Sequence, residues 1–411
     1  MAGLNDTPNA NRLHIAFFGL RNAGKSTLVN AFAGQEVAIV SDVAGTTTDP
    51  VSKAMEILPL GPCLLTDTAG LDDEGDLGEL RVRRALDVLA TTDVAVWVSA
   101  APDGSARADD VIHARFVEEC RRRDVTVLEY YRGEDVEAFR RKVASVKRVE
   151  ATKPLLADLV EKGDVVLLVC PQDGSAPKGR LILPQQQVIR ELLDAGCVAQ
   201  VCQPASIPAL LGDGERWHCK FAITDSQAFG EVDATLPPEI PLTSFSVLFA
   251  RAKGDLAAFC EGLEALRALN DGDTVLVAEG CTHHRQCGDI GSVKLPKAVE
   301  KLTGKKLNFV FCSGGDFLLE KMLRGLGVEK LRSLDDQTSQ NPQASKLPSL
   351  VIHCGGCMLT RREMARRIAV AQDVGVPITN YGLVLAAANG LQINPATCMI
   401  RRGKQSRIAA V

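Results

Sequence analysis

An eight-residue stretch near the N-terminus, GLRNAGKS, constrains the fold of this 411-residue chain more than any other feature of its sequence. It fits the pattern GxxxxGK[ST], directly after a β-rich run, His14–Phe18, and directly before a helix-compatible run, Thr27–Phe32. Backbone N–H groups at a helix N-terminus form an anion site, and the lysine of this pattern reaches the terminal phosphates of a nucleotide. The expected nucleotide-binding residues are Gly19, Leu20, Arg21, Asn22, Ala23, Gly24, Lys25, Ser26 and Thr27.

Two further segments complete a magnesium-dependent phosphate site. Asp67-Thr68-Ala69-Gly70 follows a second β-rich run, where an aspartate holds the magnesium water and a glycine amide contacts the third phosphate. Between the two motifs, the segment GTTTD at 45–49 offers a threonine for the metal. The expected catalytic residues are Lys25, Ser26, Thr47, Asp67 and Gly70, with Ser26 and Thr47 as the Mg²⁺ ligands.

The length and the alternation of short β-rich runs with helical stretches predict several α/β domains. A chain of this length exceeds one ordinary core, and βα alternation favours parallel sheets. We expect a P-loop GTPase domain with a mostly parallel sheet at 1–155, followed by two further α/β domains with parallel sheets at 160–265 and 270–411. Besides the run that precedes the phosphate loop, the expected strands are Cys63–Asp67, Val94–Val98, Val125–Leu128, Asp164–Val169, Val198–Cys202, His218–Thr224, Thr274–Ala278, Asn308–Phe311, Leu350–His353 and Val376–Ile378.

The composition gives no general reason to expect a nucleic-acid or membrane partner. Apolar residues make up 46% of the chain and charged residues 24%, and the formal net charge is -4. The N-terminal residues do not resemble a targeting signal, and no run of 18 apolar residues occurs. A cytoplasmic location follows as the default, and most of the thirteen cysteines are expected to be reduced core residues.

Cysteine and histidine gather in the last part of the chain. Cys281 and His283 follow one expected strand, and the segment HCGGC, with His353, Cys354 and Cys357, follows another. Loops at the carboxyl ends of parallel strands lie on one rim of a sheet, so the two motifs can converge. Three thiolates with a histidine suit zinc or an iron–sulfur cluster equally well, while a redox pair or structural thiols are the alternatives. Chemistry alone leaves zinc and iron–sulfur open.

The nucleotide motifs resemble those of translation-factor-like GTPases of the Era and TrmE type. The shared features are Asn22 in the loop, the GTT-x-D segment and an apolar residue, Leu71, after DxxG. The resemblance implies slow hydrolysis, with K⁺ bound near Asn22 as a possible stimulator. The guanine-reading Asn-Lys-x-Asp is absent after Leu128, where the chain reads EYYRGED, and Asp135 or Glu134 are candidates to substitute for it. GTP is still favoured over ATP because the switch segments match the GTPase pattern.

Nearly the whole chain resembles the HydF family of FeFe-hydrogenase maturation GTPases. Besides the GTPase and thiol motifs, the similar peptides are 173–185, 223–229, 241–246 and 377–382. The resemblance implies a middle dimerisation domain and a last domain that binds a 4Fe-4S cluster through Cys281, Cys354 and Cys357. His283 and His353 would be a ligand or supporting groups.

The same resemblance implies a function and partners. A family member is a homodimer that carries the precursor of the dinuclear iron subcluster to the FeFe-hydrogenase catalytic subunit, after two radical-SAM maturases have acted. The segment between His283 and His353 is longer here than in the family, and a polar stretch at 331–347 can absorb the excess at little cost. The alternative function is a zinc-binding Era-like GTPase in RNA or protein assembly.

Overall fold

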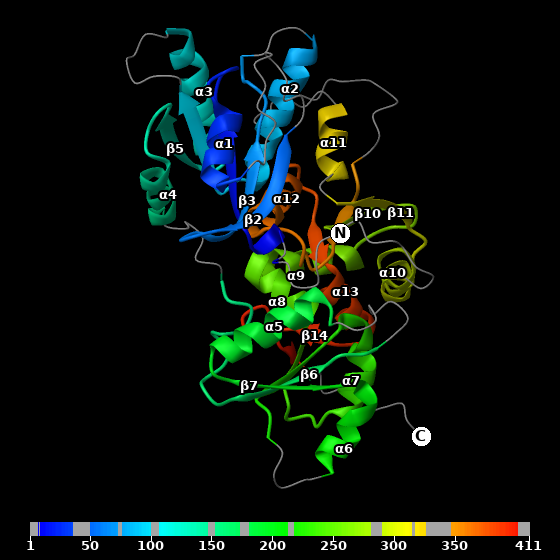
Figure 1. The fold of residues 1–411 in the computed structure, drawn as a ribbon. Helices are drawn as coiled ribbons and strands as arrows, with labels where there is room; N and C mark the ends of the chain where they lie inside the picture. Colours follow the sequence, from blue (N-terminus) through cyan, green and yellow to red (C-terminus); the bar gives the residue numbers. More distant parts are fainter. Residues whose placement is uncertain are drawn as a thin grey trace. The chain divides into compact units, whose positions relative to one another are not determined.

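The computed structural model describes residues 7, 9–35, 50–72, 76–99, 107–146, 153–172, 181–212, 218–280, 290–314, 317–325 and 347–401. The chain divides into two compact units, 1–151 and 152–411 (Figure 1). Within the described residues, no helix is long and apolar enough to cross a membrane.

The first unit holds a five-stranded sheet in the order β2-β3-β1-β4-β5, in which only β2 runs antiparallel to its neighbour. Its strands are β1 (Leu13–Phe18), β2 (Val51–Ile57), β3 (Gly61–Asp67), β4 (Val94–Ser99) and β5 (Thr126–Tyr131). Its α-helices are α1 (Lys25–Ala33), α2 (Asp76–Asp87), α3 (Arg107–Arg122) and α4 (Val136–Ser145), with 3-10 turns at Asn9–Asn11 and Val88–Thr91.

Apolar side chains cover both faces of this sheet, as a central parallel strand requires. All six residues of β1 are buried, and alternate ones enter different cores. On one face Phe17 packs edge-on against Phe32 of α1, and Phe139 of α4 joins them. On the other face Phe18 packs on Phe116 of α3. The carboxyl end of β1, where the phosphate loop begins, is therefore held from both sides.

The second unit contains two parallel four-stranded sheets. The first, in the order β7-β6-β8-β9, is built from β6 (Val165–Val169), β7 (Val198–Cys202), β8 (Phe221–Thr224) and β9 (Leu242–Ser244). The second, in the order β11-β10-β12-β13, is built from β10 (Thr274–Glu279), β11 (Asn308–Ser313), β12 (Leu350–His353) and β13 (Ile378–Asn380). Their helices are α5 (Leu183–Asp194), α6 (Ile207–Leu211), α7 (Phe229–Thr235), α8 (Phe245–Lys253), α9 (Leu256–Arg267), α10 (Leu295–Thr303), α11 (Leu318–Gly325), α12 (Arg361–Asp373) and α13 (Tyr381–Ala388). Short elements complete the unit: 3-10 turns at Pro204–Ser206 and Ser226–Ala228, a π-helical turn at Ile290–Lys294, and the antiparallel pair β14 (Gln392–Ile393) and β15 (Ile400–Arg401).

The two sheets share one strand order and end in the same kind of unit. In both, the first strand is central, the second lies at one edge, and the third and fourth follow on the other side. The last strand of each runs into a helix whose N-cap side chain accepts a backbone N–H: Ser244 from Val247, and Asn380 from Gly382. The sequence shows no repeat of fixed period, but the structure is built twice on one plan.

The predicted fold class, a P-loop GTPase domain followed by parallel α/β sheets, is confirmed. One apolar core joins the two sheets of the second unit, running from Leu156 to Ile400. Helix α9, expected mostly with the middle part, packs on β13, where Gly262 lies so close to the Ile378 carbonyl that a Cβ would be 2.0 Å from its oxygen. The division into domains at 160–265 and 270–411 stays a prediction.

Candidate functional site

The backbone of the phosphate loop has the conformation that its glycines permit. Gly19 has φ 148°, and a Cβ there would lie 2.4 Å from the Val98 carbonyl oxygen. Asn22 and Gly24 lie in the left-handed region, with φ 61° and 97°, and α1 begins at Lys25. Residues of the predicted motif therefore form a tight turn whose amides precede a helix N-terminus, which is the arrangement that binds phosphate.

Lys25 and Ser26, the first two residues of α1, hydrogen-bond to the phosphate loop and to the DxxG aspartate. The buried Lys25 Nζ donates to the carbonyl oxygens of Leu20 at 2.7 Å and Gly19 at 3.3 Å, so its ammonium bends over the loop. Ser26 Oγ donates to Asp67 Oδ2 at 2.6 Å. Burial raises the pKa of Asp67, while the Ser26 hydrogen bond and the charge of Lys25 oppose the rise.

The Ser26–Asp67 pair fits a magnesium ion. Asp67 Oδ1 is buried and has no hydrogen-bond partner among the described residues, which is costly unless another group uses it. A hydroxyl and a carboxylate are the hard oxygen donors that Mg²⁺ takes, usually with water and substrate phosphates completing the shell. The third predicted participant, Thr47, lies outside the described residues, so its place in the site stays a prediction.

The DxxG segment lies directly against the phosphate loop. A Cβ at Gly70 would lie 2.8 Å from the Arg21 amide nitrogen, so only glycine allows this approach. The Leu71 amide donates to the Gly19 carbonyl at 3.2 Å, and the Arg21 amide donates to Asp72 Oδ1 at 2.6 Å. Asp72 was not predicted as a site residue. Its sequence offers one indication, an acidic side chain two positions after the DxxG motif. Its carboxylate bonds a loop amide of the kind that binds phosphate.

The second predicted site centres on the thiol loop, residues 353–357, which follows β12. The Cys354 amide donates to the Ala278 carbonyl of β10 at 2.9 Å. Cys354 Sγ in turn accepts two backbone N–H groups, from Gly280 at 3.1 Å and from Gly356 at 3.4 Å. Backbone amides directed at sulfur are typical of cysteines that ligate iron–sulfur clusters.

The contact with Gly280 brings the two distant motifs to one place. Gly280 is the last described residue before Cys281, and its amide touches the sulfur of Cys354. The expected convergence of the loops after β10 and β12 is therefore seen up to residue 280. Cys281 and His283 themselves lie outside the described residues. Among the residues that are described, no group of three His, Cys, Asp or Glu side chains could hold a metal ion.

Glycines and burial shape the thiol loop. Gly356 has φ 66°, and a Cβ at Gly355 would lie 3.1 Å from Ser246 Oγ of α8. Burial raises the pKa of Cys354, and it raises that of Cys357 to about 11, although Lys253 opposes the second shift. Both thiols are protonated at neutral pH when no metal is bound, so a metal would have to displace their protons to bind here.

Lys253, at the end of α8, donates hydrogen bonds to the backbone of the thiol loop. Its Nζ donates to the carbonyls of Gly356 at 3.2 Å, Cys357 at 3.0 Å and Leu359 at 2.7 Å, which uses all three ammonium donors. Burial lowers its pKa to about 8. The role of Lys253 was not predicted from the sequence, because no motif surrounds it and these three carbonyls lie more than 100 residues away in the chain.

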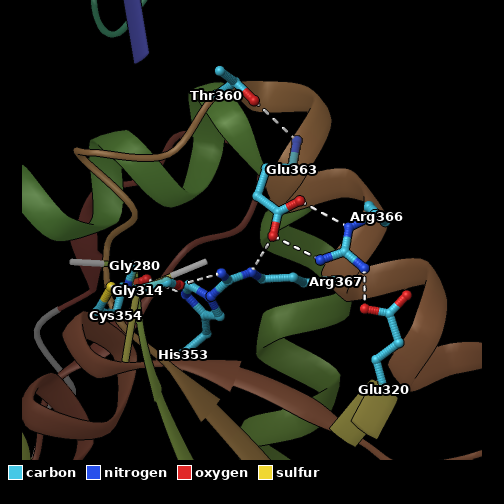
Figure 2. A network of polar contacts seen from close by, with 9 residues as sticks. All are labelled: Gly280, Gly314, Glu320, His353, Cys354, Thr360, Glu363, Arg366 and Arg367. Atoms are coloured by element: carbon cyan, nitrogen blue, oxygen red, sulfur yellow. Dashed lines mark hydrogen bonds and ion pairs between the residues drawn. The ribbon is translucent and has the colours of Figure 1, made fainter. Parts of the chain in front are cut away.

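His353 is fixed by a network of buried charges (Figure 2). The fully buried Arg367 of α12 points at it and donates from Nη1 to His353 Nε2 at 3.1 Å and from Nη2 to the Gly314 carbonyl at 2.7 Å. Arg367 Nε donates to Glu363 Oε1 at 2.7 Å, and Arg366 bridges the other side of Glu363 to Glu320. The sequence pattern of α12 did not predict the burial of Arg367, because a charged residue on a helix normally faces solvent.

These contacts define the protonation state of His353. Its Nδ1 lies 2.8 Å from the Cys354 carbonyl, to which it must donate, and its Nε2 must accept from Arg367. Burial and the arginine charge lower its pKa to about 4, so the ring is neutral. With both nitrogens engaged, the geometry favours the supporting role over the ligand role among the two that were predicted for His353.

The sheet and phosphate loop of the first unit define a P-loop domain of the GTPase class. The second unit adds two parallel sheets with their helices, and the thiol loop follows strand β12 of the second sheet. Residues 14–129 match the family model described as 50S ribosome-binding GTPase. Residues 155–254 match the hydrogen maturase F dimerization domain, and residues 257–395 match the hydrogen maturase F tetramerization domain. These two models cover more than half of the chain, which belongs to the hydrogen maturase F (HydF) family, as predicted.

Two curated relatives are similar to about a quarter of this chain. The tRNA modification GTPase MnmE of Herminiimonas arsenicoxydans is 41% identical over 108 residues, which are 25% of this chain and 23% of that protein. MnmE of Acidiphilium cryptum (strain JF-5) is 47% identical over 92 residues, 22% of this chain and 21% of that protein. The chain thus spans less than a quarter of these relatives. The crystal structure of Aquifex aeolicus Era bound to GDP.AlF4- matches with 16% sequence identity and a TM-score of 0.26. The match covers 73% of this chain and 92% of that one.

Proposed function

We propose that this chain is a GTP-hydrolysing scaffold and carrier in FeFe-hydrogenase maturation. It binds a 4Fe-4S cluster through Cys281, Cys354 and Cys357 and delivers the dinuclear iron subcluster precursor to the hydrogenase catalytic subunit. Its other partners are two radical-SAM maturases, and its location is cytoplasmic. Membership of the hydrogen maturase F family supports the process, and the thiol loop supports the cargo site.

One observation carries the cluster site. The Gly280 amide donates to Cys354 Sγ at 3.1 Å, which brings the residue before Cys281 to the loop of the other two thiols. Three thiolates leave one iron of a four-iron cluster without a protein thiolate, so a precursor has a place to attach and to leave. A bound cluster supplies iron and sulfide as this attachment point.

The residues around the thiol loop serve to hold and tune it. Gly280 and Gly356 donate N–H groups to sulfur, which stabilises a thiolate. Lys253 places a buried positive charge next to the loop and donates to two of its carbonyls, those of Gly356 and Cys357, and to that of Leu359 beyond it. His353 holds the carbonyl of Cys354 through Nδ1, and Asn380 Nδ2 also donates to that carbonyl at 3.3 Å.

The nucleotide domain acts as a switch rather than as a driver of cluster chemistry. Ser26, Thr47 and Asp67 hold Mg²⁺, Lys25 contacts the terminal phosphates, and the Gly70 amide responds to the third phosphate. The docked DxxG segment, with Asp72 on the Arg21 amide, supports such a response because an arriving phosphate competes for the same loop. Nucleotide state then changes affinity for a partner.

The chain is a homodimer, and β7 is the expected contact. This strand forms one edge of its sheet, and Val198 and Val201 on it are 52% and 44% exposed. Leu193, near the end of α5, is 60% exposed. An unpaired edge with exposed apolar residues pairs readily with a second chain.

Anaerobic reconstitution with iron and sulfide tests the cluster site. We expect about four iron and four sulfide per chain, and little of either after Cys354→Ser or Cys357→Ser, because the thiolates are the ligands. Cys260→Ser, a thiol of α9 outside the loop, is the matched control and keeps full loading. Uptake of one zinc, with no iron or sulfide, would instead support the zinc-binding alternative and overturn the scaffold.

A further inference from the structure

The loop between β5 and α4 stands where a GTPase reads the guanine base, and its carboxylates are committed elsewhere. Residues 107–146 are described without a gap, so the whole loop is seen. The carboxylates that could read a base there are Glu129, Glu134 and Asp135. Each has at least one oxygen in a hydrogen bond that shapes the protein.

Asp135 serves as the N-cap of α4. Its Oδ1 accepts from the Glu137 amide at 3.0 Å, and its Oδ2 accepts from the Ala138 amide at 3.3 Å. A side chain that caps a helix in this way stabilises it by ~1 kcal/mol and is held at the helix end. Both oxygens of the carboxylate therefore accept hydrogen bonds from backbone amides of α4.

Glu134 and Glu129 are tied to the tyrosines that end β5. Glu134 Oε2 accepts from the Tyr131 amide at 3.3 Å, and the Glu134 amide donates to the Tyr131 carbonyl at 2.9 Å. Tyr130 Oη donates to the Glu134 carbonyl at 2.9 Å. Glu129 Oε2 accepts from Tyr131 Oη at 2.7 Å, and His113 lies 3.5 Å from its Oε1. The turn is closed on itself.

Helix α4 prevents the turn from opening toward a ligand. Phe139 packs edge-on against Tyr130 of β5, with ring centroids 5.1 Å apart, and against Phe32 of α1 at 6.2 Å. Arg140 donates from Nε to the Phe32 carbonyl at 2.9 Å and from Nη2 to the Ala31 carbonyl at 3.0 Å. Four residues, 132–135, therefore join a fixed strand to a fixed helix.

Guanine recognition requires a carboxylate that is free on both oxygens. Guanine presents N1–H and N2–H donors side by side, and a bidentate carboxylate accepts both, whereas adenine has an acceptor at N1. A site built on such a pair rejects a base that lacks the donors by ~10⁴–10⁵-fold. The match to the GTPase family model ends at Glu129, just before this turn.

The described residues of the phosphate half of the same site are arranged for phosphate and magnesium. The loop turn of Gly19 and Gly24, the Lys25 ammonium and the Ser26–Asp67 pair are all in place. These groups contact only phosphate and magnesium, which GTP and ATP share. Binding energy is therefore available to any purine nucleoside triphosphate.

We infer that this chain recognises its nucleotide by the phosphates and magnesium and not by the base, so that adenine nucleotides bind as well as guanine nucleotides. The inference rests on the proposed function in one respect, that a nucleotide binds at the phosphate loop.

Calorimetric titration of the full chain with GDP and with ADP, each with Mg²⁺, tests the inference. We expect the two dissociation constants to agree within about tenfold, against the ~10⁴-fold of a base-reading site. GDP binding more than about tenfold tighter than ADP would overturn the inference and leave the proposed function standing. Binding of neither nucleotide would overturn both.

Two variants make the test independent of absolute affinity. If either carboxylate reads guanine, Glu134→Gln or Asp135→Asn weakens GDP and strengthens xanthosine diphosphate, because an amide donates to the xanthine O2. Asparagine is as good an N-cap as aspartate, so the fold of α4 is kept. We expect the ratio of the GDP and xanthosine diphosphate affinities to stay unchanged in both variants. A shift toward xanthosine diphosphate in either one would assign base reading to that side chain and overturn the inference.

Discussion

The phosphate loop and the thiol loop solve the same problem with different means. Each follows the carboxyl end of a parallel strand, and each uses left-handed glycines to turn backbone N–H groups toward an anion or a thiolate. The phosphate loop holds its shape through contacts within residues 19–26 and with its direct neighbours, β4 and the DxxG segment. The thiol loop depends on side chains from α8, α12 and β13.

This difference predicts which loop tolerates the loss of a side chain without losing its conformation. A loop that supports itself can lose a ligand-binding side chain and keep its form. A loop held by buried charges from distant helices cannot lose one of them without leaving a partner unpaired.

Lys25→Ala should remove nucleotide turnover and leave the fold and the cluster site intact. Loss of one preorganised charge at the terminal phosphates costs on the order of 100-fold or more in rate. Phosphate release and iron content, measured on the same preparation, check both halves. The exposed Lys53→Ala on β2 is the control, with normal turnover. Loss of the cluster in Lys25→Ala would contradict the separation of the two sites.

Arg367→Met should destabilise the second unit by about 3–5 kcal/mol, because it removes the fully buried partner of Glu363 and leaves His353 Nε2 without its donor. Chemical unfolding of the metal-free protein measures the change. Arg267→Met on α9 breaks an exposed ion pair with Glu264 and should cost at most about 1 kcal/mol. Equal costs for the two arginines would refute the claim that the thiol loop depends on buried charges.

Acid should weaken the metal-free protein through His353. Its pKa is about 4 when folded and 6.5 when exposed, so the unfolded chain binds more protons between these values. Stability is therefore complete above pH 6.5 and is lost as the pH falls toward 4, by about 3 kcal/mol from this group.

The free energy of unfolding, measured at pH 7 and pH 4.5, checks the contribution of His353. His353→Gln removes the titrating group, so its stability should fall less over this range than that of the unchanged protein. Parallel losses in the two proteins would show that His353 is not buried in its neutral form.

Thr360→Ala should have the smallest effect. Thr360 Oγ1 accepts from the Glu363 amide at 3.1 Å and caps α12, so its loss should cost about 1 kcal/mol. Thermal unfolding measures it, with Thr360→Ser, which keeps the cap, as the control. A cost as large as that of Arg367→Met would mean that the helix end, and not the buried charges, holds the loop.

The sequence predicts what is written in consecutive residues. The strand, turn and helix around Lys25 follow from one motif, because glycines and the lysine act within a few positions of each other. The central strands were predicted within a few residues, since buried parallel strands are continuous apolar runs. Strand β8 begins at Phe221 rather than His218, because the charged Lys220 pairs with Asp164 beside the strand.

What the sequence does not predict depends on contacts between distant residues. Strand β2 was missed because most of its residues are exposed and show no apolar run. Lys253 and Arg367 were missed because a charged residue on a helix is normally solvated, and only tertiary structure shows its buried partners. The convergence on Cys354 was predictable, since it follows from parallel topology alone.

The position of Lys253 decides how this protein can be divided for experiments. Helix α8 belongs by sequence to the dimerization domain, 155–254, yet its two ends touch the thiol loop through Ser246 and Lys253. A fragment that starts at residue 257 keeps Cys354 and Cys357 but loses the Lys253 ammonium and its three hydrogen bonds to backbone carbonyls at 356–359. A stable cluster-binding fragment must therefore begin before residue 245, at the cost of carrying the last strand of the neighbouring sheet with it.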